Sequence, residues 1–142
     1  MQITGTCHCG AITLEADADP QRVIACHCKD CQAFSGAPFR AVLAVKAAKV
    51  SITGSPKHYE KIAASGNKRV QAFCADCGCQ LYATEPHNPT TMNFRLGWLD
   101  QREQLVPKAQ IWHQSSMPWL AQLASIPAHE MGLNSPLVRT EN

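Results

Sequence analysis

The sequence has little of what an electrostatic or membrane-bound function needs. Charged residues make up only 17% of the 142 residues, and Lys+Arg 13 against Asp+Glu 11 leaves a formal net charge of +2. The longest cationic cluster is Lys68 and Arg69, whereas nucleic-acid-binding proteins usually carry a basic stripe. The most apolar stretch, 41–45, is far shorter than the roughly 20 residues that span a bilayer. These absences argue against a nucleic-acid partner, an anionic membrane surface and a membrane-spanning segment.

Signals for export or for division into several domains are also missing. Residues 1–7 contain neither a basic n-region nor an apolar h-region, so they do not resemble a secretory signal, and we expect a cytoplasmic protein. The length matches one domain, and 45% hydrophobic residues suffice for a single packed core. Because periodicity is lost beyond about residue 125, we expect one domain over residues 1–125 and a C-terminal tail over residues 126–142.

Cysteine, by contrast, is abundant and clustered. A disulfide framework would spread its cysteines to join distant loops, whereas C-x-C and C-x-x-C pairs place two thiolates on one tight turn, as a tetrahedral zinc ion requires. The eight cysteines fall into three tight groups, which are Cys7 and Cys9, then Cys26, Cys28 and Cys31, then Cys74, Cys77 and Cys79. This spacing favours zinc over disulfides, an iron–sulfur cluster or a redox C-x-x-C pair.

Two of the short cysteine pairs complete one closed zinc site. A structural zinc ion takes four protein ligands, usually as two short pairs from separate turns. Cys7 with Cys9, and Cys74 with Cys77, form such pairs, and a glycine follows each pair where a tight turn often requires a positive φ. We assign these four cysteines to a structural zinc site that joins the N-terminal strand to a mid-chain hairpin, and we expect zinc removal to unfold the domain.

The middle group supplies three thiolates without a second pair. Cys26, Cys28 and Cys31 would leave a fourth position of a zinc ion open to water or substrate, which is the arrangement of a catalytic site. Cys79 or His27 could close this site instead. His27 lies between two cysteines, however, and a side chain in that position usually points away from the metal.

The remaining sequence predicts an all-β fold of short antiparallel strands. Ten short segments are rich in β-branched and aromatic residues, often at alternating positions, and are separated by turn residues. These segments are 2–6, 11–16, 22–25, 39–45, 51–53, 58–61, 69–73, 80–84, 91–96 and 108–112. Short helices or turns are expected only at 30–34 and 118–124. Core packing is the expectation for the three tryptophans, Trp98, Trp112 and Trp119, with a fold-back of residues 118–123 over the metal cleft as the alternative.

Several ordered motifs together resemble one known family. They are Gly5-Thr-Cys-His-Cys-Gly10, Cys26-His-Cys-Lys-Asp-Cys31, Ser35-Gly-Ala-Pro-Phe39, Phe73-Cys-Ala-Asp-Cys-Gly78, Gly97-Trp-Leu-Asp100, Ile111-Trp112 and Pro118-Trp-Leu120. Their order and spacing resemble the glutathione-dependent formaldehyde-activating enzyme family, also called the CENP-V/GFA domain, from about Gly5 to Leu120.

The resemblance implies a β-tent fold with two zinc ions per chain. It places a structural zinc on Cys7, Cys9, Cys74 and Cys77, and a catalytic zinc on Cys26, Cys28 and Cys31, the same division that the spacing suggested. The reaction of the family joins formaldehyde and glutathione to S-hydroxymethylglutathione, so the resemblance implies a carbon–sulfur lyase. The expected partner is therefore a small-molecule thiol or thiol adduct, with glutathione as the cosubstrate.

Glutathione carries two carboxylates, so its pocket should offer cations or amide donors. The candidate cations near the motifs are Lys29, Arg40, Lys68, Arg69 and Arg95, although each alone is better explained as a solvated surface charge. Gln32 occupies the position after the three-cysteine motif, where relatives carry a basic residue or a glutamine. Cys79 replaces the small residue common in the family and is interpreted as a bystander thiol.

Other residues have weaker claims to a role. Asp30, next to the open site, is a candidate general base or simply a turn cap, and His27 is a candidate proton carrier. His8 could bind zinc, but its position between two cysteines favours a side chain that points away, and His58 and His113 have no assigned role. Two further function classes remain open. A zinc-stabilised binding module of the same fold would need no open metal position, and a redox module would form reversible disulfides once stripped of metal.

Overall fold

The chain folds into two β-sheets, built from the short strands that the alternating pattern predicted. A computed structural model describes residues 1–139, so residues 140–142 of the expected tail lie outside the described residues. The smaller sheet has the order β1-β2-β5 and is antiparallel throughout. Its strands are β1 (Gln2–Thr6), β2 (Thr13–Asp17) and β5 (Val50–Thr53). The all-β prediction is confirmed.

The larger sheet has seven strands in the order β10-β3-β4-β9-β8-β7-β6. All neighbours are antiparallel except β10, which pairs with β3 in parallel. The strands are β3 (Val23–Cys26), β4 (Arg40–Lys46), β6 (Lys57–Ile62), β7 (Lys68–Phe73), β8 (Gln80–Thr84), β9 (Thr91–Arg95) and β10 (Ala109–Ile111). Every predicted strand forms, with its ends within two residues of the expected bounds.

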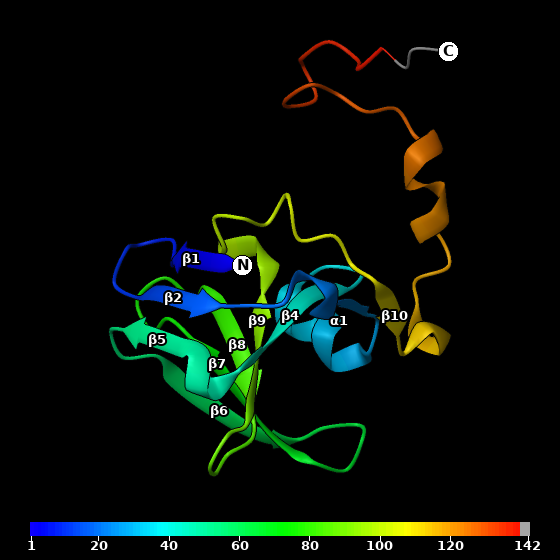
Figure 1. Ribbon diagram of the computed structural model, residues 1–142. Coiled ribbons are helices and arrows are strands. Elements are labelled where there is room, and N and C mark those ends of the chain that lie inside the picture. The colour runs from blue at the N-terminus through cyan, green and yellow to red at the C-terminus, as the bar shows by residue number, and fades with distance from the viewer. Residues whose placement is uncertain (140–142) are drawn as a thin grey trace.

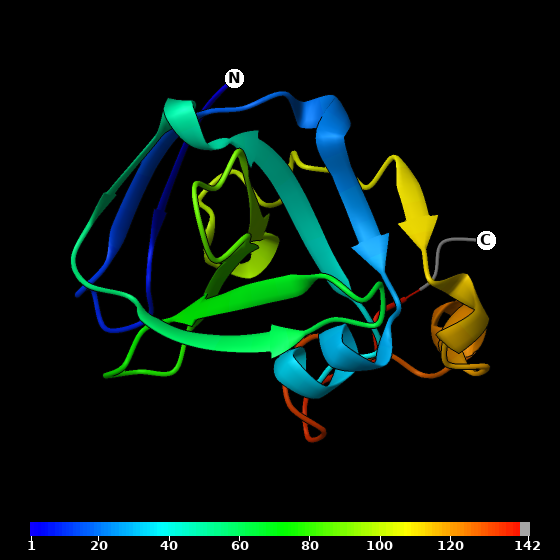
Figure 2. The same cartoon turned by 90° about the horizontal axis from the view of Figure 1, so that it is seen from below.

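One face of the larger sheet packs against the smaller sheet (Figures 1 and 2). Because side chains alternate between the faces of a strand, every second residue of β3, β4 and β9 enters the core between the sheets. The largest fully buried side chains are Phe94, Ile3, Ile12, Leu14, Leu43, Leu81, Leu99 and Leu105. Phe94 contacts the rings of Tyr82 and Trp98 at centroid distances of 5.6 and 6.1 Å. This aromatic cluster fixes the centre of the larger sheet.

The other face of the larger sheet is covered by the only α-helix of the described residues, α1 (Lys29–Ser35). Gly36 ends α1 with a φ of 63°, in the left-handed region that favours glycine. Asp30 pairs with Lys61 of β6 at 2.6 Å, and the ring of Phe34 lies 6.1 Å from that of Tyr59. Helix α1 is therefore attached to the edge of the sheet by both a charged and an aromatic contact.

Short 3-10 turns connect the strands, and the chain after β10 leaves the two sheets (Figure 1). The turns are η1 (Pro20–Arg22), η2 (Ala47–Lys49), η3 (Leu96–Trp98), η4 (His113–Ser115) and η5 (Leu120–Ser125). Turn η5 takes the place of the expected helix at 118–124. Among residues 1–139, no helix is long and apolar enough to cross a membrane.

The prediction of core packing holds for one of the three tryptophans and is wrong for the other two. Trp98 is buried and donates its indole N–H to the carbonyl oxygen of Leu81 at 2.9 Å. Trp112 and Trp119 are 38% and 46% exposed. Both follow β10, where the chain has left the region between the sheets, so the core cannot cover them.

Candidate metal centres and active site

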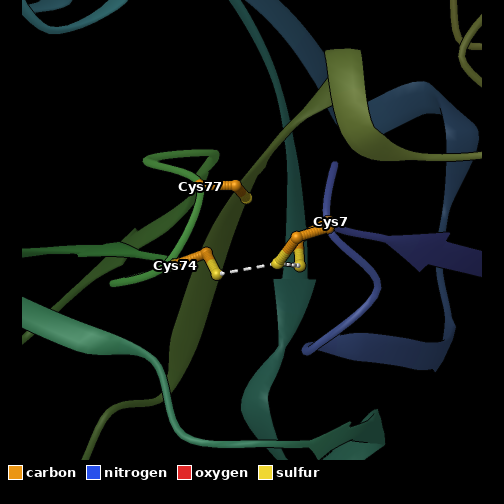
Figure 3. A group of neighbouring side chains, drawn as sticks. Cys7, Cys74 and Cys77 are labelled. Carbon is orange, nitrogen blue, oxygen red and sulfur yellow. Dashed lines mark hydrogen bonds between the residues drawn. The ribbon is translucent and has the colours of Figure 1, made fainter.

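The first candidate centre brings together cysteines from two distant parts of the chain. Cys7 and Cys9 follow β1, and Cys74 and Cys77 lie in the turn between β7 and β8. All four sulfur atoms lie within 4.8 Å of one another. Figure 3 shows the side chains of Cys74 and Cys77 directed across the gap toward Cys7.

Backbone geometry aims these four side chains at one point. Gly10 and Gly78 have φ values of 85° and 73°, which allows each turn to fold back after its second cysteine. The Gly78 N–H donates to the carbonyl oxygen of Cys74 at 2.8 Å, and the Ile12 N–H donates to the sulfur of Cys7 at 3.3 Å. The positive φ values expected from the sequence are thus confirmed.

The donor set fits a tetrahedral metal ion. Metal–sulfur bonds of about 2.3 Å at tetrahedral angles separate neighbouring sulfurs by about 3.8 Å. The Sγ–Sγ distances are 3.7 Å between Cys7 and Cys9 and 3.6 Å between Cys9 and Cys74. Four soft thiol donors at this separation match the chemistry of a closed zinc site.

The second candidate centre consists of Cys26, Cys28 and Cys31, named here the cysteine trio. Cys26 ends β3, Cys28 caps the N-terminus of α1, and Cys31 lies in its first turn. The Cys31 N–H donates to the sulfur of Cys28 at 3.3 Å, and the three sulfur atoms lie within 4.8 Å of one another. The strand-to-helix turn thus gathers three thiols within six residues.

Neither residue suggested as a fourth ligand joins the cysteine trio. In residues 1–139, the only groups of three or more close metal-binding side chains are the two cysteine clusters, and both exclude Cys79 and His27. The thiol of Cys79 lies near the carbonyl oxygen of Gln80 at 4.0 Å. Nε2 of His27 forms a 2.7 Å hydrogen bond with the side-chain oxygen of Gln110, and the ring contacts Phe39. The trio is therefore an open, three-sulfur arrangement.

The cysteine trio lies in a positive electrostatic environment. The pKa of Cys31 is lowered to about 5, chiefly by its hydrogen bond with Cys26, against the effect of burial and with help from the charge of Arg40. The same contact raises the pKa of Cys26. The two thiols therefore titrate as one interacting pair.

Two of the candidate cations were wrongly expected at the surface. Arg40 and Arg95 are each only 7% exposed, on the same face of the sheet as Cys26. Both donate to the side-chain oxygen of Gln71, at 3.3 and 2.7 Å. Burial, together with the charge of Arg40, lowers the pKa of Arg95. The expectation of exposure was wrong because both arginines lie in central strands under α1, where solvent does not reach them.

The other candidate site residues are either exposed to solvent or engaged in contacts with neighbouring side chains. Lys29 and Lys68 are exposed, and Arg69 pairs with Glu85 at 3.5 Å. Asp30 is engaged by Lys61, so its carboxylate is not free to act as a base. His8 is exposed, His58 contacts the hydroxyl of Tyr82 at 3.3 Å, and the ring of His113 lies 5.5 Å from that of His27.

Gln32 ties the motif to the chain that follows β10. Its side-chain amide donates to the carbonyl oxygens of His27 at 2.9 Å and Ser115 at 2.8 Å. These two hydrogen bonds use both protons of the amide nitrogen, so the nitrogen cannot donate to a substrate. Gln32 therefore positions η4 against α1.

A pocket between α1 and the strands β6, β7 and β8 was not anticipated from the sequence. It has a volume of about 280 Å³ and is lined by Phe34, Tyr59, Gln71, Phe73 and Gln80. Tyr59, Gln71 and Phe73 lie on one face of the sheet, the face that α1 covers. No local motif marks these residues; only the alternation within β6 and β7 hints that they share a face.

Comparisons with known proteins identify the family of the chain and support its fold. A family model described as "Glutathione-dependent formaldehyde-activating enzyme" matches residues 2–115. An uncharacterized lyase of Schizosaccharomyces pombe is 32% identical over 97 residues, which cover 67% of this chain and 66% of the relative, slightly less than two thirds of its length. The crystal structure of a Rhodobacter sphaeroides protein is similar with a TM-score of 0.58 and 18% identity, covering 75% of this chain and 98% of the other, which supports the fold.

Proposed function

The chain belongs to the glutathione-dependent formaldehyde-activating enzyme family, and from this premise we propose that it is a zinc-dependent carbon–sulfur lyase. Its proposed substrate is an adduct of a thiol and an aldehyde, such as S-hydroxymethylglutathione. The zinc-binding domain of this proposal comprises residues 1–125, in the β-tent form of the family, followed by a tail.

The proposal gives the two cysteine clusters different roles, one structural and one catalytic. Cys7, Cys9, Cys74 and Cys77 would hold a structural zinc ion, because four thiols enclose the position completely. Cys26, Cys28 and Cys31 would hold the catalytic zinc ion. When bound there, zinc would supply a Lewis acid and lower the pKa of a thiol.

The chemistry requires the chain to hold a thiolate next to a carbonyl carbon. In the lyase direction the carbon–sulfur bond breaks and its electron pair leaves with the sulfur as a thiolate. The hydroxyl of the adduct gives its proton to solvent water and becomes the carbonyl of the aldehyde. The reverse reaction forms the same bond from a thiolate and the aldehyde. The 280 Å³ pocket between α1 and the strands β6, β7 and β8 offers room for the body of a thiol.

The observation that carries the proposal is the open geometry of the cysteine trio. Three sulfur atoms lie together at the start of α1, and neither Cys79 nor His27 supplies a fourth ligand. A closed site would serve a zinc-stabilised binding module as well as an enzyme, whereas an open site has a position for substrate.

Zinc analysis tests the proposal directly. Elemental analysis of the freshly purified, reduced protein should find two zinc ions per chain, one of which a mild chelator removes and glutathione protects. The wild-type protein should also accelerate the exchange between formaldehyde, glutathione and their adduct, measured by NMR. Cys28→Ser should abolish this acceleration and Cys79→Ser should retain it. Two inert zinc ions without acceleration would favour the binding module.

A further inference from the structure

Two buried arginines near the cysteine trio share one neutral side-chain acceptor, and Arg95 also donates to the carbonyl oxygen of Asn93 at 3.4 Å. Arg40 and Arg95 both donate to the side-chain oxygen of Gln71, and Nε of each guanidinium is buried without a hydrogen-bond partner. None of the ion pairs formed within residues 1–139 involves either arginine. Burying two like charges without a carboxylate is costly, so another negative group must compensate them.

The register of the strands identifies that negative group as the thiolates of the cysteine trio. Arg40 lies directly opposite Cys26 in the antiparallel pair of β3 and β4. Directly opposite side chains share a face with Cβ atoms about 5 Å apart. Arg95 lies opposite Val42, two residues along β4 from Arg40, and therefore on the same face.

The identity of residue 71 is informative. An oxygen, not a nitrogen, must face the two guanidinium groups, because guanidinium only donates hydrogen bonds. A glutamate would provide that oxygen with a full negative charge and would form two ion pairs. The chain instead holds the arginines with an uncharged amide, which leaves their positive charge available to the neighbouring sulfurs.

We infer that Arg40 and Arg95, held by Gln71, act as positioning residues that favour an anionic sulfur ligand, a thiolate, at the open position of the cysteine trio. The inference rests on the proposed function and concerns its thiolate, which is the product in the lyase direction and a substrate in the reverse direction. Three thiolates and one divalent zinc ion carry a net charge of −1, and a fourth thiolate makes it −2. Two guanidinium groups balance that charge, so the site accepts a fourth thiolate that it would otherwise repel.

Gln71→Glu tests the inference with almost no change in shape. The variant should fold, and melt no lower than the wild type, because the new carboxylate pairs with both arginines. It should nevertheless bind a thiolate about tenfold more weakly, since one positive charge is cancelled inside the site. Gln71→Met, the matched control, removes the acceptor without adding charge, so it should weaken thiolate binding clearly less than Gln71→Glu does once folding is confirmed by circular dichroism.

The probe is 2-mercaptoethanol, whose only negative charge is on its sulfur, so a carboxylate cannot be the group that the arginines recognise. Binding to the full chain loaded with Co²⁺ in place of zinc is followed by the sulfur-to-cobalt absorption band at constant pH. Equal affinity of Gln71→Glu and wild type, or an equal loss in Gln71→Met, would overturn the inference while leaving the lyase proposal intact. No thiol binding by the wild type would overturn both.

A second pair of variants keeps the inference testable if a change at residue 71 disturbs the fold. Arg95→Gln removes one charge, and Arg95→Lys retains it. Arg95→Gln should weaken 2-mercaptoethanol binding about tenfold, and Arg95→Lys should weaken it much less. Arg22→Gln makes the same chemical change at an exposed position and should leave the affinity unchanged. An equal loss in both Arg95 variants would show that Arg95 serves packing alone, which contradicts the inference.

Discussion

The two cysteine clusters should contribute very differently to stability, because they close loops of different length. Both contain a C-x-C and a C-x-x-C spacing, so the short loops closed by a metal are the same in each. The four-cysteine cluster also joins Cys9 to Cys74, which are 65 residues apart. The difference in stability therefore equals the contribution of this one long loop.

Its magnitude follows from the entropy of loop closure. A cross-link that closes a loop of 65 residues stabilises the folded state by about 4 kcal/mol in the chain-entropy relation used for disulfides. For a domain of this size, about 3 °C of melting temperature corresponds to 1 kcal/mol. Opening the four-cysteine cluster should therefore lower the melting temperature about 12 °C more than opening the cysteine trio.

Single serine substitutions measure this difference. Cys9→Ser is suitable because Cys9 is exposed, so the substitution creates no cavity. Cys28→Ser opens the trio and retains a favoured N-cap for α1. Cys79→Ser is the control for a thiol outside both clusters. Melting is followed by circular dichroism and zinc content by elemental analysis. Equal melting temperatures for Cys9→Ser and Cys28→Ser would refute the argument from loop length.

Three further substitutions test the scaffold by chemical denaturation. Phe94→Ala should cost about 4 kcal/mol, because it empties the centre of the core; a loss below about 1 kcal/mol would contradict that packing. Gln32→Ala should cost about 2 kcal/mol through its two hydrogen bonds and make the chain after β10 more sensitive to protease, and unchanged cleavage would show that η4 is held by other contacts. Gly54→Ala should also cost several kcal/mol, since φ is 97° and the new Cβ would collide with the carbonyl oxygen of Ala11. A variant as stable as the wild type would contradict this collision.

The strands were predictable because their signal is local. In β1 the burial alternates strictly, with Ile3 inside and Thr4 outside, and this period is visible in the sequence itself. The order of strands was not predictable in the same way. The pairing of β2 with β5, and the parallel pairing of β10 with β3, join segments far apart in the chain. Such contacts depend on the packing of the whole domain and leave no local pattern.

The cysteines were predictable for the same reason, whereas their surroundings were not. Short spacings place two thiols on one turn, so the sequence alone groups Cys26, Cys28 and Cys31. The burial of Arg40 and Arg95 depends instead on neighbours supplied by other strands and by α1. An arginine in isolation is expected at the surface, and only the assembled sheet shows that these two are covered.

The alternation of the central strands links the stability of the core to the geometry of the site. In β4, Leu43 packs into the core and Arg40 faces the cysteine trio. In β9, Phe94 and its neighbour Arg95 are divided between the same two faces. A slip of the register by one residue would exchange these faces, burying a charge in the core and exposing an apolar side chain to the site. The hydrophobic core thus fixes the register of β4 and β9, and through it the positions of the two positive charges beside the cysteine trio.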